Sequence, residues 1–578
     1  MIRTFDQHHI RTTEELNGLW NMSIGEREWL TSVPGCWEQI LELTTYQGSA
    51  SYHRSFHIRN DAAAVRLVFK GVSHTADVYV DGEHVGHHYD AYIPFDIVLP
   101  HLDRGEHELR VDVDNSFGPD SALHIPNDYY SYGGITRGVR LEALPEAYIK
   151  NMRCTPHLND GGWSATTEVT IANISQENTT VDLQISMAGK EATYRSLEIP
   201  GQSEKTITWD ENYDEITSWS CNNPQLYQVC AQLFTDDLAD DGQLIDDLID
   251  RIGFRTVATQ GRQLLLNNEP IFLLGLNGHE EYGSFGSAVP FESIVQDIQY
   301  FKDLGANAVR TSHYPNDELF LDLCEEAGIL VWEENHARGL NLERMSNPNF
   351  DRQCAECNEA MVTNHSNHPS IVIWGLLNEC ASDTEGGRKK YEAQFSQIRS
   401  LDTSRPVTSA TCQHFADICL DLGDIVSVNL YNGWYESGST EDRLNREIEW
   451  IDSNDKPFDS ATNKTAGSAT DLKPIIVSEF GASGLYGFHD QFGAQKWSEE
   501  RQSQILEDNL HAYLNNKNLT GLFVWQFADN RVSEEEWFLT RPRLHNNKGI
   551  VDEFRRPKLA YGTVKRMFHE YSASHCGL

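Results

Sequence analysis

The chain has 578 residues, of which 39% are apolar and 10% aromatic, and its formal net charge is −41. This length predicts two to four domains, and no stretch approaches the roughly 18 consecutive apolar residues of a membrane-spanning helix. The strong negative charge argues against nucleic acid or an anionic membrane as a partner. An acidic substrate would therefore need a locally basic pocket.

Eleven cysteines are spread along the chain from Cys36 to Cys576. Their number is odd, and the close pair Cys354 and Cys357 lacks a second pair or a histidine at zinc-finger spacing. We therefore expect free thiols in a reducing compartment. The first nine residues lack the apolar core of a secretory signal, so for the chain as given we expect a cytoplasmic location.

Residues 1–148 have the pattern of an all-β domain. The apolar stretches 65–69 and 76–80 indicate strands, and Asp81-Gly82 is a strong signal for a hairpin turn. Leu109, Val111 and Val113 alternate with polar residues, as in a strand with one buried face. Because no helical period is evident, the pattern favours a β-sandwich of jelly-roll type.

Residues 149–257 continue the β pattern on a smaller scale. Strands are predicted at 168–171, 180–185 and 226–229, with polar turns between them. About a hundred residues of this kind suggest an immunoglobulin-like sandwich.

Residues 258–578 alternate between strands and helices. A hairpin is predicted from the stretches 264–266 and 271–274, followed by an amphipathic helix over 294–304 that ends at Gly305. A strand at 308–309, a helix over 319–324 that ends before Gly328 and a strand over 329–332 come next. This alternation predicts a parallel sheet, and about 320 residues suit one (β/α)8 barrel.

Two buried strands of this region are each followed by a glutamate. Ile371–Trp374 is too short for a helix and too continuous for a half-exposed strand, and it leads to Asn378 and Glu379. Pro474–Val477 leads to Glu479 in the same way. Two carboxylates at the carboxyl ends of barrel strands form the pair that glycoside hydrolysis requires.

Other predicted strands also end in polar residues, namely at Gly278–Glu281, Arg310–Tyr314, Glu333–His336, Asn429–Tyr431 and Trp525–Asp529. In a barrel these ends converge on one cleft; the alternative is that each is a solvated or salt-bridged terminus. An amide such as Asn378 can hydrogen-bond a sugar hydroxyl. Flat faces for a pyranose ring, or alternatively core packing, are offered by Tyr431, Trp434, Tyr435 and Trp525.

A metal site is a competing interpretation of the same residues. His279, His313, Glu333 and His336 carry groups that zinc and other first-row metals accept as ligands. No tight spacing such as HExxH supports it, so we favour hydrolysis without a metal.

The order of regions and several motifs resemble glycoside hydrolase family 2 over nearly the whole chain. The segment from Ile373 to Glu379 resembles the family's acid/base motif, and Ser478–Gly481 its nucleophile motif. Arg310–Pro315 and the stretch Gly278-His279-Glu280 also match. The resemblance implies a jelly-roll sugar-binding domain, an immunoglobulin-like domain and a catalytic barrel. It further implies that Glu379 is the general acid/base and Glu479 the nucleophile.

Within the family, three segments resemble β-glucuronidases. His545–Gly549 is similar to their Asn-x-Lys motif, which would place Asn546 and Lys548 on the C6 carboxylate of the sugar. Asn429–Tyr435 resembles their tyrosine-bearing loop, with Tyr435 at the matching position. Asn127–Gly134 resembles the segment that brings an aspartate, here Asp128, to the substrate. An arginine expected before the Asn-x-Lys motif has two candidates, the slightly offset Arg543 and Arg541.

We therefore expect a retaining exo-β-glucuronidase that needs no metal or organic cofactor. Its partner would be a small glucuronide or the terminal glucuronic acid of a saccharide, and the resemblance suggests a homo-oligomer. The alternatives are activity on β-galacturonides, β-galactosides or β-mannosides, or a carbohydrate-binding protein on an inactivated barrel. The expected substrate contacts are Asp128, His279, Asn378, Asn429, Tyr431, Tyr435, Trp525, Arg543, Asn546 and Lys548.

Overall fold

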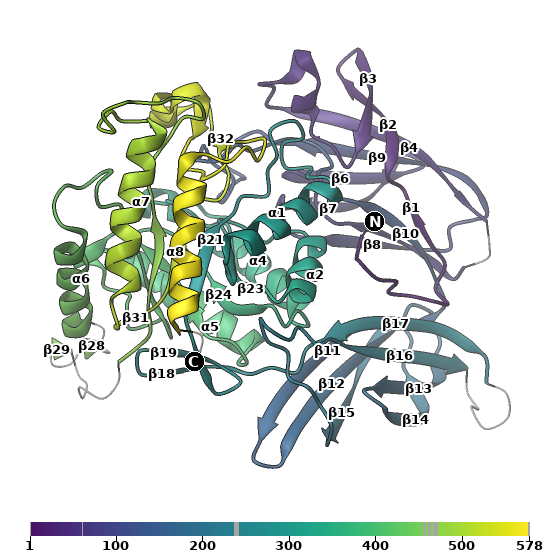
Figure 1. Cartoon of the computed structure of the whole chain (residues 1–578). Helices are drawn as coiled ribbons and strands as arrows, with labels where there is room; N and C mark the ends of the chain where they lie inside the picture. Colours follow the sequence, from purple (N-terminus) through teal and green to yellow (C-terminus); the bar gives the residue numbers. More distant parts are fainter. Residues whose placement is uncertain are drawn as a thin grey trace.

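The structure is a computed structural model that describes residues 2–59, 62–235, 242–454, 458–459, 464–465 and 472–575. Figure 1 shows two β-sandwiches, coloured purple and blue, packed against one side of a barrel whose surrounding helices are teal to yellow. This arrangement confirms the predicted fold class: two all-β units followed by an α/β barrel.

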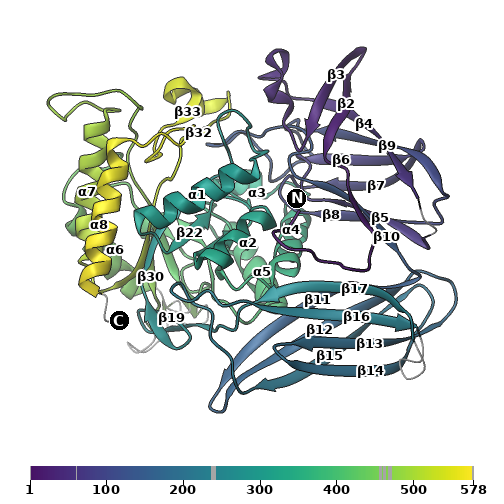
Figure 2. The same ribbon diagram turned by 45° about the vertical axis from the view of Figure 1, so that its right-hand side comes forward.

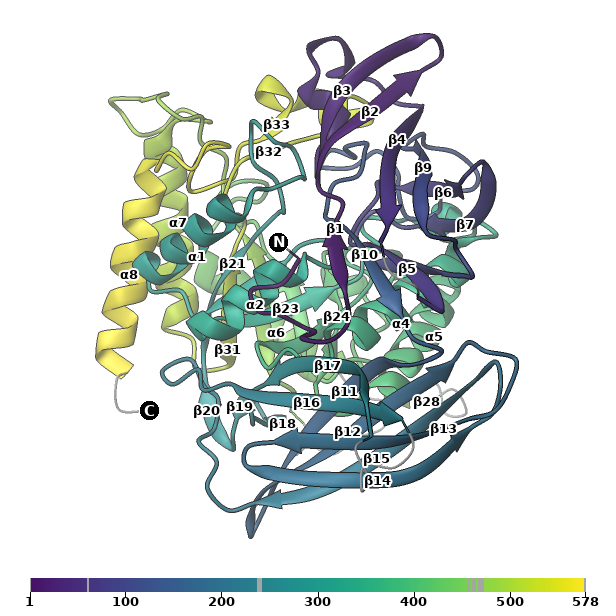
Figure 3. The same ribbon diagram turned by 90° about the vertical axis from the view of Figure 1, so that its right-hand side faces the viewer.

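The first unit is a sandwich of two antiparallel sheets. Its strands are β1 Thr13–Glu15, β2 Gly18–Ile24, β3 Arg27–Val33, β4 Ser49–Ile58, β5 Ala64–Phe69, β6 Thr75–Val80, β7 Glu83–Tyr89, β8 Phe95–Pro100, β9 Gly105–Asp114 and β10 Val139–Leu144. The sheet orders are β3-β2-β4-β9-β6-β7 and β1-β10-β5-β8. Leu109, Val111 and Val113 of β9 are buried, as their alternation predicts. Asp81 and Gly82, with positive φ, form the predicted turn between β6 and β7. Figure 3 shows this unit from its outer side.

The second unit is a smaller antiparallel sandwich. Its strands are β11 Ala147–Asn159, β12 Gly162–Asn173, β13 Thr179–Met187, β14 Lys190–Ile199, β15 Ser203–Tyr213, β16 Tyr227–Thr235 and β17 Leu244–Ile252. They form sheets of order β11-β12-β15 and β14-β13-β16-β17, which run across the lower part of the molecule in Figure 2. Val169, Ile171, Leu183 and Val229 are buried between the sheets, where alternating apolar residues belong in such a fold.

The third unit is built on a parallel sheet that curls into a ring. Its strands are β21 Leu273–Asn277, β22 Ala308–Thr311, β23 Leu330–Glu334, β24 Ile371–Gly375, β25 Val407–Thr408, β26 Ala410–Thr411, β27 Val426–Asn429, β30 Ile475–Phe480 and β31 Leu519–Val524. The sheet begins with β25 and ends with β26, in the order β25-β24-β23-β22-β21-β31-β30-β27-β26. Since only Ser409 separates β25 from β26, these two short strands occupy one position and close the ring.

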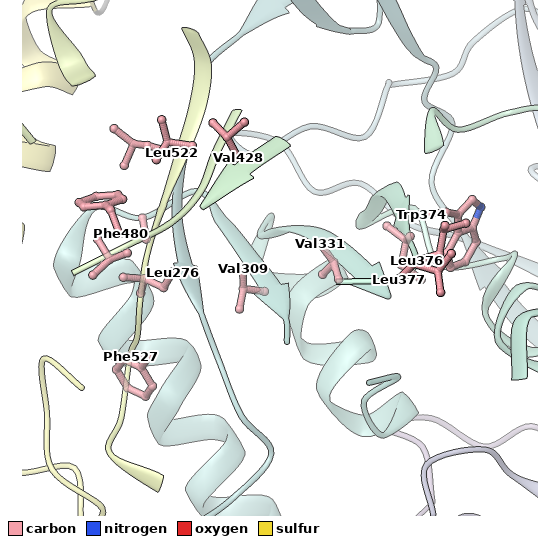
Figure 4. Packing of buried hydrophobic residues seen from close by; sticks show 14 of the residues in the cluster. Leu276, Val309, Val331, Trp374, Leu376, Leu377, Val428, Phe480, Leu522 and Phe527 are labelled. Carbon is pink, nitrogen blue, oxygen red and sulfur yellow. The ribbon is translucent and has the colours of Figure 1, made fainter. Parts of the chain in front are cut away.

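Helices pack around the outside of this ring. They are α1 Phe291–Leu304, α2 Glu318–Ala327, α3 Leu342–Met345, α4 Phe350–His365, α5 Glu385–Leu401, α6 Thr440–Asn454, α7 Glu499–Leu514 and α8 Leu559–His575. The first two were predicted from their apolar spacing, and both end at a glycine with positive φ, Gly305 and Gly328. Figure 4 shows barrel residues such as Leu276, Val309, Val331 and Val428, which belong to the core shared with these helices.

The lower end of the barrel is closed by a short antiparallel sheet of β18 Val257–Gln260, β19 Gln263–Leu266 and β20 Glu269–Ile271. Leu264 and Leu266 belong to one buried cluster with Leu330 and Phe523 of the barrel strands. The stretch predicted as one strand over 271–274 is divided: β20 completes the hairpin and β21 begins the barrel. Because the lower end is plugged, the opposite end holds the accessible cavity.

The ten cysteines in the described residues are free thiols, and Cys576 lies outside those residues. No helix of the described part is long and apolar enough to cross a membrane.

Candidate active site

A cavity of about 310 Å³ lies at the carboxyl end of the barrel strands. Glu379 and Glu479, which the sequence places after two separate strands, both line it. The other lining residues are Asp128, Arg338, Cys412, His414, Asn429, Tyr431, Tyr435, Glu436, Trp525, Trp537, Arg541 and Lys548. A cavity of this size is at the lower end of the range for small-molecule sites.

Glu379 lies four residues beyond the end of β24 and is held in an unusual backbone conformation. Its φ is 52°, in the left-handed region that residues other than glycine rarely adopt. Asn429 Nδ2 donates a hydrogen bond to Glu379 Oε1 at 2.8 Å, and the Ser478 hydroxyl donates to Asn429 Oδ1 at 2.7 Å. The serine therefore determines which end of the Asn429 amide faces the glutamate.

Glu479 lies within β30 and is almost fully buried. Arg310 Nη1 donates to its Oε1 at 2.8 Å, and the Tyr431 hydroxyl donates to its Oε2 at 2.7 Å. Burial raises the pKa of Glu479 to about 7, and the nearby Glu379 carboxylate acts in the same direction, whereas Arg310 and Tyr431 oppose the shift. Both donors stabilise the ionised carboxylate, which is the form that can attack carbon.

Arg310 links Glu479 to Glu334 and Asn378 through buried hydrogen bonds. Its Nε and Nη2 donate to the two carboxylate oxygens of Glu334, each at 2.8 Å, and Nη2 also donates to Asn378 Oδ1 at 2.8 Å. Because Asn378 Oδ1 is engaged in this way, its amide nitrogen is oriented in the opposite direction. That nitrogen is buried and has no hydrogen-bond partner in the described residues, and Asn378, an expected substrate contact, does not itself line the cavity.

One wall of the cavity is aromatic. The indole of Trp525 lines the cavity and stacks on His313, with ring centroids 4.9 Å apart. His279 meets Trp525 edge-on at 5.6 Å without lining the cavity itself, so it supports the indole from behind. Trp434 packs in the protein core against Ala482 and Ile505, which is the alternative that its sequence position left open.

A second part of the cavity wall carries two cations. Lys548 is 1% exposed, and its ammonium donates to the Tyr435 hydroxyl at 2.9 Å. Arg541 Nε donates to Asp128 Oδ1 at 3.0 Å, and Asn546 Nδ2 donates to Asp128 Oδ2 at 2.9 Å. Burial, followed by the nearby Arg541 guanidinium, lowers the pKa of Lys548. Two cations beside one carboxylate leave this wall with an excess positive charge, which suits an anionic group.

Asp128 reaches this wall from the first β-sandwich. It lies in the segment between β9 and β10, which is held against the barrel by several hydrogen bonds. Asn127 N donates to Ser533 Oγ at 2.8 Å, and Asn530 Nδ2 donates to the carbonyl of Asp128 at 3.0 Å. The first unit therefore contributes Asp128 to the lining of the cavity, where the resemblance of Asn127–Gly134 implies an aspartate.

Arg541, rather than Arg543, is the arginine of this wall. Arg543 was among the expected substrate contacts, but it does not line the cavity and pairs with Glu553, with its side chain 49% exposed. The reason is the local backbone conformation. Because the φ of Arg543 is 61°, within the turn, its side chain points in a different direction from those of its neighbours. A sequence offset of two residues could not reveal this change of direction.

Arg338 lines the cavity although the sequence reasoning did not select it. Its Nη1 donates to Asn127 Oδ1 at 2.7 Å, and its Nη2 lies 3.4 Å from Glu379 Oε2. The sequence signal for Arg338 was weak, because this residue lies two positions beyond the polar stretch Glu333–His336 and so does not directly follow a predicted strand. Its side chain links the first unit to the candidate acid/base.

The residues of the alternative metal site do not converge on the cavity. His313 Nδ1 lies 2.8 Å from Glu334 Oε1, whereas Glu333, on the other face of the strand, pairs with His365 at 2.9 Å. His336 is directed away from the cavity toward Asp90 of the first unit. Among the described residues, none of the groups able to hold a metal ion combines these predicted ligands.

Two carboxylates facing one cavity at the carboxyl end of a (β/α)8 barrel define the site of a glycoside hydrolase. Comparison with protein families agrees with this class. The description "Glycosyl hydrolases family 2, sugar binding domain" matches residues 38–145, "Glycosyl hydrolases family 2" matches 147–255, and "Glycosyl hydrolases family 2, TIM barrel domain" matches 257–572. The chain belongs to family 2 of the glycosyl hydrolases.

Several relatives resemble the whole chain. A β-galacturonidase from Eisenbergiella tayi, in a crystal structure with bound galacturonate, is 46% identical with a TM-score of 0.92, covering 99% of each chain. A β-D-glucuronidase from Dictyoglomus thermophilum is 25% identical with a TM-score of 0.81, again covering 99% of each chain. A β-glucuronidase from Streptococcus agalactiae is 27% identical over 96% of both sequences.

Proposed function

We propose that this protein is a retaining exo-β-uronidase that removes a terminal β-linked hexuronic acid from its aglycone, with β-galacturonides as preferred substrates. The observation that carries the proposal is the buried Lys548 ammonium, with Arg541 beside it, on the wall of the cavity that also holds Glu379 and Glu479. In a protein of net charge −41, a buried cation at this place is well suited to hold a sugar carboxylate.

The proposed reaction proceeds by double displacement. Glu379 donates a proton to the glycosidic oxygen while Glu479 attacks the anomeric carbon and forms a covalent glycosyl-enzyme. Glu379 then removes a proton from water, which displaces Glu479. The contacts of Arg310 and Tyr431 with Glu479 support the nucleophile role, because both donate hydrogen bonds that favour its ionised form. Retention is tested by NMR, which should detect the β-anomer of the sugar as the first product.

Galacturonides and glucuronides differ only in the configuration at C4, so both uronides can use the same carboxylate contacts. The sequence analysis favoured glucuronides, and relatives described as β-glucuronidases are 25–27% identical over nearly the whole chain. The galacturonidase of Eisenbergiella tayi is much more similar, at 46% identity. We therefore rank galacturonides first and keep glucuronides as the second candidate.

A matched substrate panel tests the proposal. We expect kcat/KM on p-nitrophenyl β-galacturonide to exceed that on p-nitrophenyl β-glucuronide by at least about tenfold, because a site built to hydrogen-bond one C4 hydroxyl leaves groups unpaired with its epimer. Both uronides should exceed p-nitrophenyl β-galactoside, which lacks the carboxylate. A preference for the glucuronide would select the second candidate. Preference for the galactoside over both would contradict the uronidase proposal.

The raised pKa of Glu479 predicts the acidic limb of the pH profile. The nucleophile must be ionised, so kcat/KM should fall as the pH is lowered through about 7, where Glu479 becomes protonated. In Tyr431→Phe the carboxylate loses one hydrogen-bond donor and its ionised form becomes less stable. We expect this limb to move to higher pH by about one unit, since a hydrogen bond to a charged group contributes about 1.5 kcal/mol or more. An unchanged midpoint in the variant would assign the limb to another group.

A further inference from the structure

Asp90, His336 and Cys357 form a buried cluster outside the active cavity. Asp90 follows β7 in the first sandwich, His336 lies two residues beyond β23 of the barrel, and Cys357 lies on α4. Their exposed fractions are 3%, 0% and 1%. One carboxylate oxygen, one ring nitrogen and one sulfur lie within 4.8 Å of one another. The cluster therefore joins three segments that are far apart in the sequence.

The separations in the cluster approach those of a tetrahedral metal centre. His336 Nδ1 lies 3.4 Å from Asp90 Oδ2 and 3.9 Å from Cys357 Sγ. A zinc ion with bonds of about 2.0 Å to nitrogen and oxygen and about 2.3 Å to sulfur holds neighbouring ligand atoms about 3.3–3.6 Å apart. The first separation lies within this range, and the second exceeds it by about 0.3 Å.

The buried carboxylate of Asp90 has no lysine or arginine partner in the described residues. Its Oδ2 is buried and has no hydrogen-bond partner in the described residues, and the ion pair found there is with His336 rather than with a lysine or arginine. An ionised carboxylate is costly to bury without a compensating cation. The other two convergent groups in the described residues differ, because Arg3 and Arg251 bond to Asp322 and Glu325 in one and Arg11 bonds to Asp246 in the other.

The cluster can also be reached from solvent. Asp90 and Cys357 line a surface cavity of about 670 Å³ between the first sandwich and α4, together with Asp120 and Glu356. This cavity shares no lining residue with the active cavity. A metal with three protein ligands keeps a fourth position, which water from this side could occupy.

We propose that Asp90, His336 and Cys357 bind one zinc ion that clamps the first sandwich to the barrel. Thiolate, imidazole and carboxylate are all ligands that zinc accepts. Because Asp90 belongs to a different unit from His336 and Cys357, the bound ion resists separation of the two. The ion lies outside the active cavity, so its role is structural.

The test uses the full chain after treatment with a chelator. We expect one equivalent of Zn²⁺ to bind and to raise the melting temperature, because a ligand that binds only the folded state stabilises it. Co²⁺, added instead, should produce visible bands of tetrahedral cobalt and a thiolate-to-cobalt charge-transfer band in the near ultraviolet. The rise in melting temperature with Zn²⁺ and the cobalt bands should be lost in Cys357→Ser. Both should be retained in Cys154→Ser, which removes a buried thiol from the second sandwich.

Asp90→Asn provides a second variant of nearly the same shape, in case the loss of the thiol prevents folding. It should retain the thiolate band but bind Zn²⁺ at least about tenfold more weakly, since a charged ligand is lost. Hydrolysis rates should not change on addition of the chelator. Absence of the thiolate band, or equal Zn²⁺ binding by the wild type and both cluster variants, would overturn the proposal whatever sugar the enzyme hydrolyses.

Discussion

Replacing Glu479 with glutamine should lower kcat on the preferred p-nitrophenyl uronide by at least about ten-thousand-fold. Glutamine has nearly the same shape and can still interact with Tyr431, but its neutral amide cannot form the glycosyl-enzyme. Arg310 would also lose a buried charged partner, so circular dichroism and melting must accompany the kinetics. Glu441→Gln, on the exposed face of α6, makes the same chemical change away from the cavity and should leave kcat unaffected.

The companion variant Glu379→Gln distinguishes the two roles. A good leaving group such as p-nitrophenolate needs little protonation. The rate of glycosyl-enzyme formation should therefore fall less with this substrate than with a uronide of an aliphatic alcohol. Glu479→Gln should instead affect both substrates equally, because both require the nucleophile. If the two variants show the same dependence on the leaving group, the assignment of an acid/base and a nucleophile is wrong. Normal turnover by Glu479→Gln would rule out the proposed mechanism altogether.

Replacing Lys548 with alanine should abolish the preference for uronides. The ammonium is buried and donates to Tyr435, so its removal leaves the carboxylate of a bound uronide without its cation. Loss of one partner of a buried charge pair costs about 2–5 kcal/mol. We therefore expect kcat/KM on the uronide to fall by at least about a hundredfold. The rate on the matching galactoside, which has a hydroxymethyl group at this position, should change by less than about tenfold.

The comparison of two substrates separates recognition of the carboxylate from damage to the fold, because a misfolded variant would lose both activities equally. Lys565→Ala, at a surface lysine paired with Asp303 on the far side of the barrel helices, provides the matched control. Arg541→Ala should reduce uronide hydrolysis less specifically, since Arg541 also holds Asp128 in place. If Lys548→Ala lowers kcat/KM on both substrates alike, Lys548 supports the site without binding the sugar carboxylate.

The strand ends carried most of the information about the site. A parallel barrel directs the carboxyl end of every strand to the same face, so an apolar run followed by a polar residue predicts a position in the cleft. Glu379, Glu479, Asn429, Tyr431 and Trp525 were selected in this way and line the cavity, whereas His279 and Asn378, selected in the same way, do not. Asp128, Tyr435 and Lys548 came from motif resemblance, because they lie on loops that have no such periodic pattern.

The three-unit architecture and the two cavity glutamates could be recognised in the amino-acid sequence, because hydrophobic periodicity and strand-end chemistry are local properties of the chain. The choice of Arg541 over Arg543, the contact between Arg338 and Glu379, and the cluster of Asp90 with His336 and Cys357 could not. Each depends on a loop direction or on the docking of the first sandwich against the barrel. Such placements result from packing between residues tens to hundreds of positions apart, and no local pattern encodes them.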